Sequence, residues 1–234
     1  MAKTKKIILF IVEGITDEIS LGLILSRLVS THKEDVKFKI INGDLTTKEG
    51  INPQNILSKI TEQIKEFLGQ DIYKKSDIIK VVHLVDTDGA YISEDCLIHD
   101  PEIETYIYTD ESIIVSNIKK AKNRNIQKSQ ILDKLVATGT VYVDLQYEVY
   151  YFSSNIEHVL HNHSNATEEE KISYAKSFEK QYSDDLDGFI TLINDEQIAV
   201  NGTYRETWIY IKQKNNSLQR NCNFHLLINE IIEQ

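Results

Sequence analysis

The chain has 234 residues, of which 36 are acidic and 26 are basic, so its formal net charge is −10. This charge excludes a basic protein that coats nucleic acid. Apolar residues make up 41% and charged residues 26%, with nine glycines and two prolines, which excludes fibrous, low-complexity and largely disordered classes. A chain of this length can bury the core of one large domain, or slightly more.

The cysteine content and the apolar runs indicate where the protein resides. Cys96 and Cys222 are too few for a disulfide framework, which favours a reducing compartment. No run approaches the roughly 18 apolar residues that span a bilayer, and the apolar run 7–12 is too short for a secretory signal. We therefore expect a soluble cytoplasmic protein with no membrane partner. The sequence leaves open whether the protein forms a homo-oligomer.

The first 90 residues alternate between strand and helix patterns. The continuous apolar run 7–12 is typical of a strand that is covered on both faces. The expected elements, in chain order, are strand 7–12, helix 16–30, strand 36–41 closed by Asn42-Gly43-Asp44, helix 55–67 and strand 78–85. This order predicts an α/β fold, with a parallel sheet, right-handed crossovers and flanking helices.

The rest of the chain is expected to contain fewer strands. The expected elements are an irregular loop at 91–110, a helix over 111–136, an aromatic strand at 147–152, a short helix at 156–160, and helical pieces at 167–181, 185–194, 206–214 and 221–233. We predict a catalytic α/β domain at 1–163, with a mostly helical C-terminal extension at 164–234 packed on it.

Acidic residues follow two of the predicted strands. Glu13 follows the first strand, and Asp86 and Asp88 follow the third, at the edge of the sheet where α/β proteins bind ligands. Carboxylates that converge in one cleft repel each other unless a cation such as Mg²⁺ or Mn²⁺ neutralises them. The adjacent Gly14 and Gly89 would permit a sharp turn and the close approach of a phosphate. Solvated loop acids or helix caps are the alternative.

Two segments resemble the motifs of a known family. Ile11-Val12-Glu13-Gly14-Ile15-Thr16-Asp17 and Leu84-Val85-Asp86-Thr87-Asp88-Gly89 resemble those of the Toprim (topoisomerase–primase) domain. The resemblance covers residues 5–160 and implies phosphodiester chemistry on nucleic acid with Mg²⁺. It implies that Glu13 is the metal-linked general acid or base and that Asp86 and Asp88 are metal ligands. Ala90 stands where Toprim topoisomerases often carry a third aspartate, which favours the nuclease or primase branches.

A later segment resembles one branch of that family. Phe152-Ser153-Ser154-Asn155-Ile156-Glu157-His158-Val159-Leu160 is similar to the Ile-Glu motif of OLD-type nucleases and related phage-defence Toprim effectors. This implies that Glu157 is a fourth metal ligand, which would allow two metal ions; an exposed helix acid is the alternative. OLD-type proteins also contain an ATPase, but this chain has no Gly-rich phosphate loop, so ATP control would come from a separate partner.

Basic residues are scarce, and a few could contact nucleic acid. Lys119, Lys120, Lys122 and Arg124 form the one concentrated basic stretch without acids. They are candidates for a track along the phosphate backbone, with a solvated helix face as the alternative. Arg205 and Arg220, two of only four arginines, are candidates for contacts with substrate phosphates.

These features lead to three functional hypotheses. The first is a Mg²⁺- or Mn²⁺-dependent nuclease that hydrolyses DNA or RNA, with a role in phage defence. The second is a Toprim-like regulatory or partner-binding subunit that does not cleave. The third is a phosphohydrolase acting on small phosphate esters, which Glu13 after the first strand fits poorly.

Overall fold

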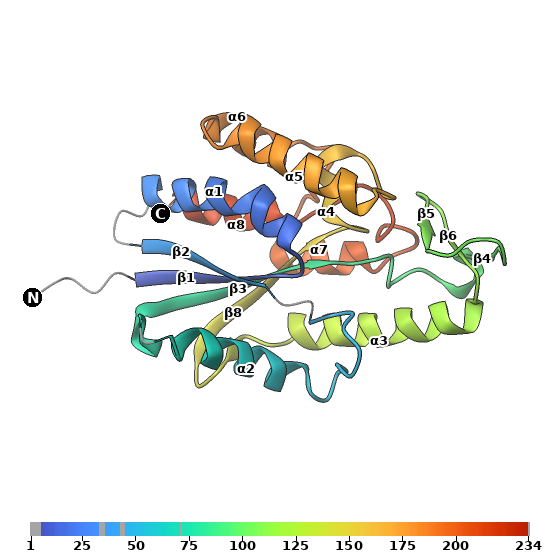
Figure 1. The fold of residues 1–234 in the computed structure, drawn as a ribbon, viewed down its shortest axis with the longest axis horizontal. Coiled ribbons are helices and arrows are strands. Elements are labelled where there is room, and N and C mark those ends of the chain that lie inside the picture. The colour runs from blue at the N-terminus through green and yellow to red at the C-terminus, as the bar shows by residue number, and fades with distance from the viewer. Residues whose placement is uncertain (1–5, 33–35, 43–44, 71, 234) are drawn as a thin grey trace, which may run out of the picture.

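A five-stranded sheet with the strand order β2-β1-β3-β8-β7 forms the centre of the molecule (Figure 1). The computed structural model describes residues 6–32, 36–42, 45–70 and 72–233, so Gly43 and Asp44, expected to close the second strand, lie outside the described residues. The strands β1 (Lys6–Val12), β2 (Val36–Asn42), β3 (Ile78–Asp86) and β8 (Leu145–Phe152) run parallel to their neighbours, and β7 (Thr140–Val141) runs antiparallel to β8. The predicted α/β class is confirmed.

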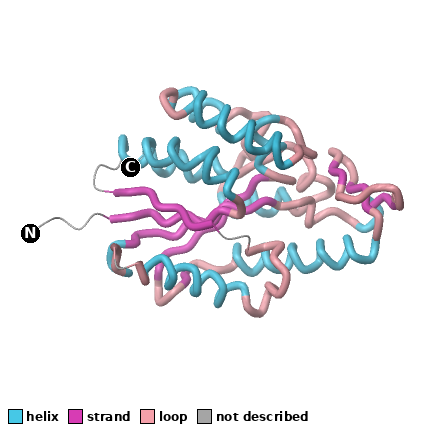
Figure 2. The backbone as a smooth tube through the Cα atoms, in the orientation of Figure 1, coloured by secondary structure: helices cyan, strands magenta, loops and turns pink. Residues whose placement is uncertain are grey.

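Helices cover both faces of this sheet (Figures 1 and 2). The helix α1 (Ile15–His32) packs on one face, and α2 (Ile56–Leu68) and α3 (Ile118–Val136) lie on the other. Alternate residues of β1 serve the two cores: Phe10 packs with the α1 side and Leu9 with the α2 side. Because successive side chains of a strand point to opposite faces, a continuous apolar run is what a sheet covered on both faces requires.

The elements that follow β8 complete both cores. They are α4 (Ile156–His161), α5 (Glu168–Tyr182), α6 (Leu186–Ile193), α7 (Tyr204–Ile211) and α8 (Phe224–Glu233). The ring centroids of Phe224 and Phe152 lie 5.4 Å apart on one face of β8, and those of Trp208 and Tyr151 lie 4.8 Å apart on the other. Residues 164–233 are therefore mostly helical, and part of this segment packs on the sheet, while the boundary at residue 163 stays a prediction.

A second, small sheet lies where a loop and the start of a helix were expected. Its strands are β4 (Leu97–His99), β5 (Ile107–Tyr108) and β6 (Ile113–Val115), in the order β4-β6-β5. The prediction of a helix from residue 111 was wrong for β6, since α3 begins at Ile118 after the N-cap Asn117. Three apolar residues are too few to show a period, and Ile113 and Val115 form a strand because they pack with Leu218, far along the chain.

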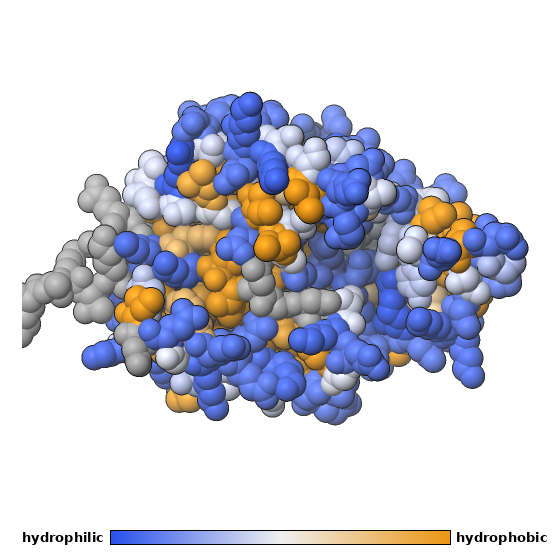
Figure 3. Space-filling model, viewed as in Figure 1, coloured by the Kyte–Doolittle hydropathy of each residue, from blue (hydrophilic) through white to orange (hydrophobic). Residues whose placement is uncertain are grey.

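Polar side chains cover most of the face shown in Figure 3, with apolar side chains gathered near its middle. Two exposed apolar residues of α1, Ile15 and Leu23, border a shallow hollow beside Phe38 of β2. Among the described residues, no helix combines the length and the apolar character that crossing a membrane requires.

A substitution at Asn223 tests whether the C-terminal segment is part of the core. Its Oδ1 accepts a hydrogen bond from the Tyr151 amide at 2.8 Å, and its Nδ2 donates to Thr207 Oγ1 at 3.2 Å, all within the protein interior. Asn223→Ala is expected to lower the free energy of unfolding by about 1–3 kcal/mol, because the buried Tyr151 amide loses its partner. Denaturant unfolding beside the exposed Gln219→Ala measures this, and equal stability of the two variants would contradict it.

Candidate active site

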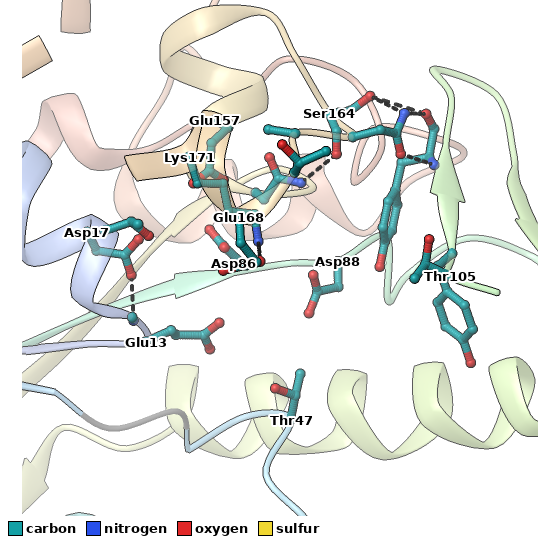
Figure 4. A pocket seen from close by; sticks show the side chains of 18 of the residues that line it. Glu13, Asp17, Thr47, Asp86, Asp88, Thr105, Glu157, Ser164, Glu168 and Lys171 are labelled. Carbon is teal, nitrogen blue, oxygen red and sulfur yellow. Dashed lines mark hydrogen bonds and ion pairs between the residues drawn. The ribbon is translucent and has the colours of Figure 1, made fainter. Parts of the chain in front are cut away.

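A partly open cavity of about 810 Å³ lies at the carboxyl ends of β1 and β3 (Figure 4). All four acids that the sequence singled out line it, and Asp17 lines it as well. Glu13 follows β1, Asp86 ends β3, and Asp88 lies in the turn after β3. Glu157 comes from the first turn of α4, which follows β8, the neighbour of β3 in the sheet. The strand order therefore brings together residues that are far apart in the sequence.

The turn after β3 is held in place by Thr87, which is completely buried. Its Oγ1 donates a hydrogen bond to the Ser217 carbonyl at 3.0 Å and accepts one from the Ser154 amide at 2.9 Å. The Asp88 amide donates to the Ser154 carbonyl at 2.8 Å. These bonds tie the turn to the end of β8 and to the C-terminal segment, and so determine where the flanking carboxylates lie.

Asp88 and Gly89 both adopt left-handed backbone conformations, with φ of 47° and 63°. Glycine is required at the second position because an added Cβ would lie 2.5 Å from Leu218 and 2.9 Å from Ile113. Gly89 thus permits close packing inside the protein. The sequence had instead predicted that this glycine lets a phosphate approach the backbone. Gly14 has no left-handed φ, and its amide donates to Asp17 Oδ2 at 2.9 Å.

A buried lysine lies among the acids on one side of the cavity. Lys128 of α3 is 1% exposed, its Nζ donates a hydrogen bond to Asp88 Oδ2, and it lies 3.7 Å from Glu13 Oε2. Burial alone would raise the pKa of Asp88, but Lys128 and Arg124 lower it below its usual value, so this carboxylate is ionised. Burial would likewise lower the pKa of Lys128, but Asp88 and Glu13 raise it, so the ammonium stays charged.

The acids on the other side are less well compensated. Burial, together with the charges of Asp17, Glu13, Asp88 and Glu157, raises the pKa of Asp86 well above its usual value. Burial raises the pKa of Asp17 to about 6 against the lowering effect of the Gly14 hydrogen bond, and burial also raises the pKa of Glu157. Such a cluster favours the binding of a proton or a cation.

The donor set fits a hard divalent cation, because all four predicted ligands are carboxylates. In the part of the chain that the structure describes, however, no three histidine, cysteine or acidic side chains are arranged to hold a metal ion as they stand. The ion pair with Lys128 contributes to this arrangement, since the ammonium already binds one carboxylate oxygen of Asp88.

The six basic residues proposed for nucleic acid do not line the cavity. Lys119 and Lys120 are exposed at the start of α3, and Lys122 pairs with Glu94. Arg205 is exposed on α7, while Arg220 donates from Nε to the Val159 carbonyl at 2.7 Å. The phosphate-contact role of these five residues stays a prediction.

Arg124, the sixth of these residues, is partly buried near the acids rather than displayed on the surface. It donates a hydrogen bond to the Asp88 carbonyl and another to Tyr108 Oη, the latter at 2.8 Å. Its guanidinium lies 4.8 Å from the ring centroid of Tyr106. The side chain is therefore already engaged within the protein, which argues against a phosphate contact of its own.

Sequence reasoning did not assign four charged residues to the site: Asp17, Lys128, Glu168 and Lys171. Asp17 could have been found from its spacing of four residues from Glu13 at the entry to a helix. Lys128 could have been found because it falls on the stripe of α3 that includes the buried Ala121 and Leu132. Lys171 of α5 lines the cavity and donates to Glu168 Oε1 at 2.8 Å, and the sequence offers no such signal for it.

Thr87→Val tests the role of the buried hydroxyl. Valine has the same shape but cannot bond to Ser154 or Ser217, so we expect the free energy of unfolding to fall by about 1–3 kcal/mol. Denaturant unfolding is measured beside Thr191→Val, which removes an exposed hydroxyl from α6. A loss for Thr87→Val no larger than for Thr191→Val would show that this hydroxyl does not hold the turn.

The raised pKa of Asp17 predicts a pH dependence of stability. Between the ordinary value of 3.8 and the folded value of about 6, the native state binds more protons than the unfolded state, so stability falls as pH rises. Asp17→Asn keeps an oxygen that can accept the hydrogen bond of the Gly14 amide. It cannot ionise, so its stability does not fall over this pH range on account of residue 17. Its stability relative to the unmodified protein should be unchanged below pH 3.8 and rise to a gain of about 3 kcal/mol above pH 6.

Thermal unfolding at several pH values measures this gain. The exposed Asp95→Asn is the control, and it should show no such trend. A gain for Asp17→Asn that is constant with pH would contradict the assignment.

Comparison of the chain with protein-family models, with curated proteins and with solved structures gives no match. The site comprises carboxylates that follow β1, that end or follow β3, and that lie on α1 and α4, all around one cavity, with a buried lysine bound to one of them. Such a set of carboxylates can hold a divalent cation.

Proposed function

We propose that the protein is a Mg²⁺- or Mn²⁺-dependent nuclease with a Toprim-like site that hydrolyses phosphodiester bonds in DNA or RNA. One observation carries the proposal: Glu13, Asp86, Asp88 and Glu157, which come from three separate segments, line the same cavity. Their convergence costs stability, because burial and mutual repulsion raise the pKa of Asp86. A bound cation would relieve this repulsion.

In this proposal the acidic residues hold the ion and the neighbouring residues handle the substrate. Glu13, Asp86, Asp88 and Glu157 would hold Mg²⁺ or Mn²⁺, which supplies Lewis-acid stabilisation of the charge that develops on a phosphoryl group. Glu13, beside the cavity, would accept the proton of the attacking water. Lys128 is buried and does not line the cavity, so it would orient Asp88 and offset part of the negative charge of the site without contacting the substrate.

The setting of the activity follows the same proposal. A reducing cytoplasm is proposed because two cysteines, Cys96 and Cys222, are too few for a disulfide framework. A separate ATPase partner and a role in phage defence are proposed on the resemblance to OLD-type proteins alone. The net charge of −10 predicts that nucleic acid binds weakly unless divalent ions neutralise the carboxylates.

A second candidate is a regulatory or partner-binding subunit that does not cleave. The observation that favours it is the Lys128–Asp88 ion pair, which already neutralises one of the acids without any metal. In that case the acids and Lys128 would form an internal charge cluster that maintains the shape of the cavity.

A cleavage assay separates these functions. The purified protein is incubated with supercoiled plasmid, total tRNA and a small phosphate ester, each with Mg²⁺, Mn²⁺ or EDTA. We expect metal-dependent cleavage of a nucleic acid, and Asp86→Asn should reduce its rate by at least about a hundredfold because a metal ligand is lost. The exposed Asp95→Asn, which makes the same chemical change outside the cavity, should leave the rate unchanged.

Each alternative predicts a different result in this assay. Hydrolysis of the small ester alone would favour the phosphohydrolase. The absence of any turnover with Mg²⁺ and Mn²⁺ would overturn the nuclease proposal in favour of the non-cleaving subunit.

A further inference from the structure

The cavity has an aromatic wall as well as an acidic side. The segment 105–108 lines it with two tyrosines, Tyr106 and Tyr108, and the loop 164–167 adjoins them. In Figure 4, Thr105 and Ser164 lie on the side of the cavity away from Glu13 and Asp17. The cavity therefore offers two different chemical environments side by side.

Hydrogen bonds hold this wall against the rest of the protein. Asn165 Oδ1 accepts a hydrogen bond from the Tyr108 amide at 2.7 Å, and Asn165 Nδ2 donates to the Tyr108 carbonyl at 2.8 Å. Asn155, the N-cap of α4, donates from Nδ2 to the Ser164 carbonyl at 2.9 Å. The strand β5 is thus joined to the connection between α4 and α5, and the wall is connected to the helix that carries Glu157.

Arg124 links the same wall to the carboxylates. Its guanidinium lies 4.8 Å from the ring centroid of Tyr106 and 5.9 Å from that of Tyr108, and it donates to Tyr108 Oη. It also donates to the backbone carbonyl of Asp88. One side chain therefore sets the position of both tyrosines relative to an acid of the site. A wall held in this way can stack on a flat ligand with little loss of its own conformational freedom.

The cavity is large enough for a nucleotide. Its volume of about 810 Å³ lies within the range of roughly 300–1,000 Å³ that is typical of small-molecule sites. Aromatic rings stack on nucleobases of any sequence, since every base has a π-face. Thr105 also lines the cavity, and a threonine hydroxyl can bond to the polar edge of a base.

We propose that Tyr106 and Tyr108 bind one unpaired nucleobase next to the phosphate that lies at the carboxylates, so that the substrate is single-stranded or looped nucleic acid. The inference deepens the proposed nuclease function and rests on it for the position of the phosphate. In a duplex both faces of each base are stacked and its edge is paired, so a base can reach the wall only after it is unpaired. Discrimination against duplex is the direct consequence.

The proposal is tested by binding in Ca²⁺ in place of Mg²⁺, with a single-stranded oligonucleotide that contains 2-aminopurine and with the duplex of the same sequence. Tyr106→Leu should raise the Kd for the single strand about tenfold, as expected when a base loses an aromatic stacking partner. It should also abolish the quenching of 2-aminopurine fluorescence. Tyr106→Phe, which retains the ring, should restore both the affinity and the quenching.

The control variant is Tyr210→Leu, which removes a partly exposed tyrosine of α7 outside the cavity and should leave binding unchanged. The duplex should bind more weakly than the single strand to the unmodified protein. Thermal unfolding of Tyr106→Leu shows whether the variant is folded. If it is not, Tyr106→Ile replaces it in the same binding assay. The unmodified protein is then also tested with an oligonucleotide that has an abasic nucleotide in place of 2-aminopurine, which removes the base instead of the ring.

Binding and cleavage fail separately in this design. Weaker single-strand binding by Tyr106→Leu supports the base site even if no metal promotes cleavage, in which case only the nuclease proposal fails. Equal binding of single strand and duplex, unchanged in Tyr106→Leu, overturns the base site even if cleavage is metal-dependent. The absence of oligonucleotide binding to the unmodified protein also overturns it.

Discussion

The buried ion pair between Lys128 and Asp88 connects the parts of the molecule that meet at the cavity. It joins α3 to the carboxyl end of β3, across 40 residues of sequence. Breaking one partner of such a pair leaves an uncompensated charge in the interior, which costs several kcal/mol. Arg124, one turn earlier on α3, binds the backbone carbonyl of the same aspartate. One helix thus directs two cations at Asp88.

The acids around the cavity are not equally compensated by positive charge, and this difference is the main chemical property of the site. Lys128 compensates Asp88 and lies near Glu13, whereas Asp86 and Asp17 keep raised pKa values because burial and mutual repulsion outweigh the attractions they receive. Repulsion of this kind persists in a folded protein only if something else stabilises the arrangement. A divalent cation and the proton are the two partners that fit carboxylates, and both link the site to solution conditions.

The segment after residue 163 holds parts of the site in position, although few of its residues lie next to the acids. The Ser217 carbonyl accepts the hydrogen bond of Thr87, and Leu218 packs where Gly89 lacks a side chain. The loop 164–167 supports the aromatic wall through Asn165. The turn that carries Asp86 and Asp88 therefore depends on contacts with residues far away in sequence, since Thr87 and Ser217 are separated by 130 positions.

The sequence by itself determined the parallel sheet and the convergence of its acids. Apolar runs such as 7–12 identify covered strands, and neighbouring parallel strands place Glu13, Asp86 and Asp88 at the same edge whatever the details of packing. Only the tertiary structure decided that Lys128 lies among these acids, that Arg124 binds tyrosines inside the protein, and that residues 113–115 form a strand. Those outcomes depend on partners distant in sequence, and local periodicity carries no information about which distant group meets a given side chain.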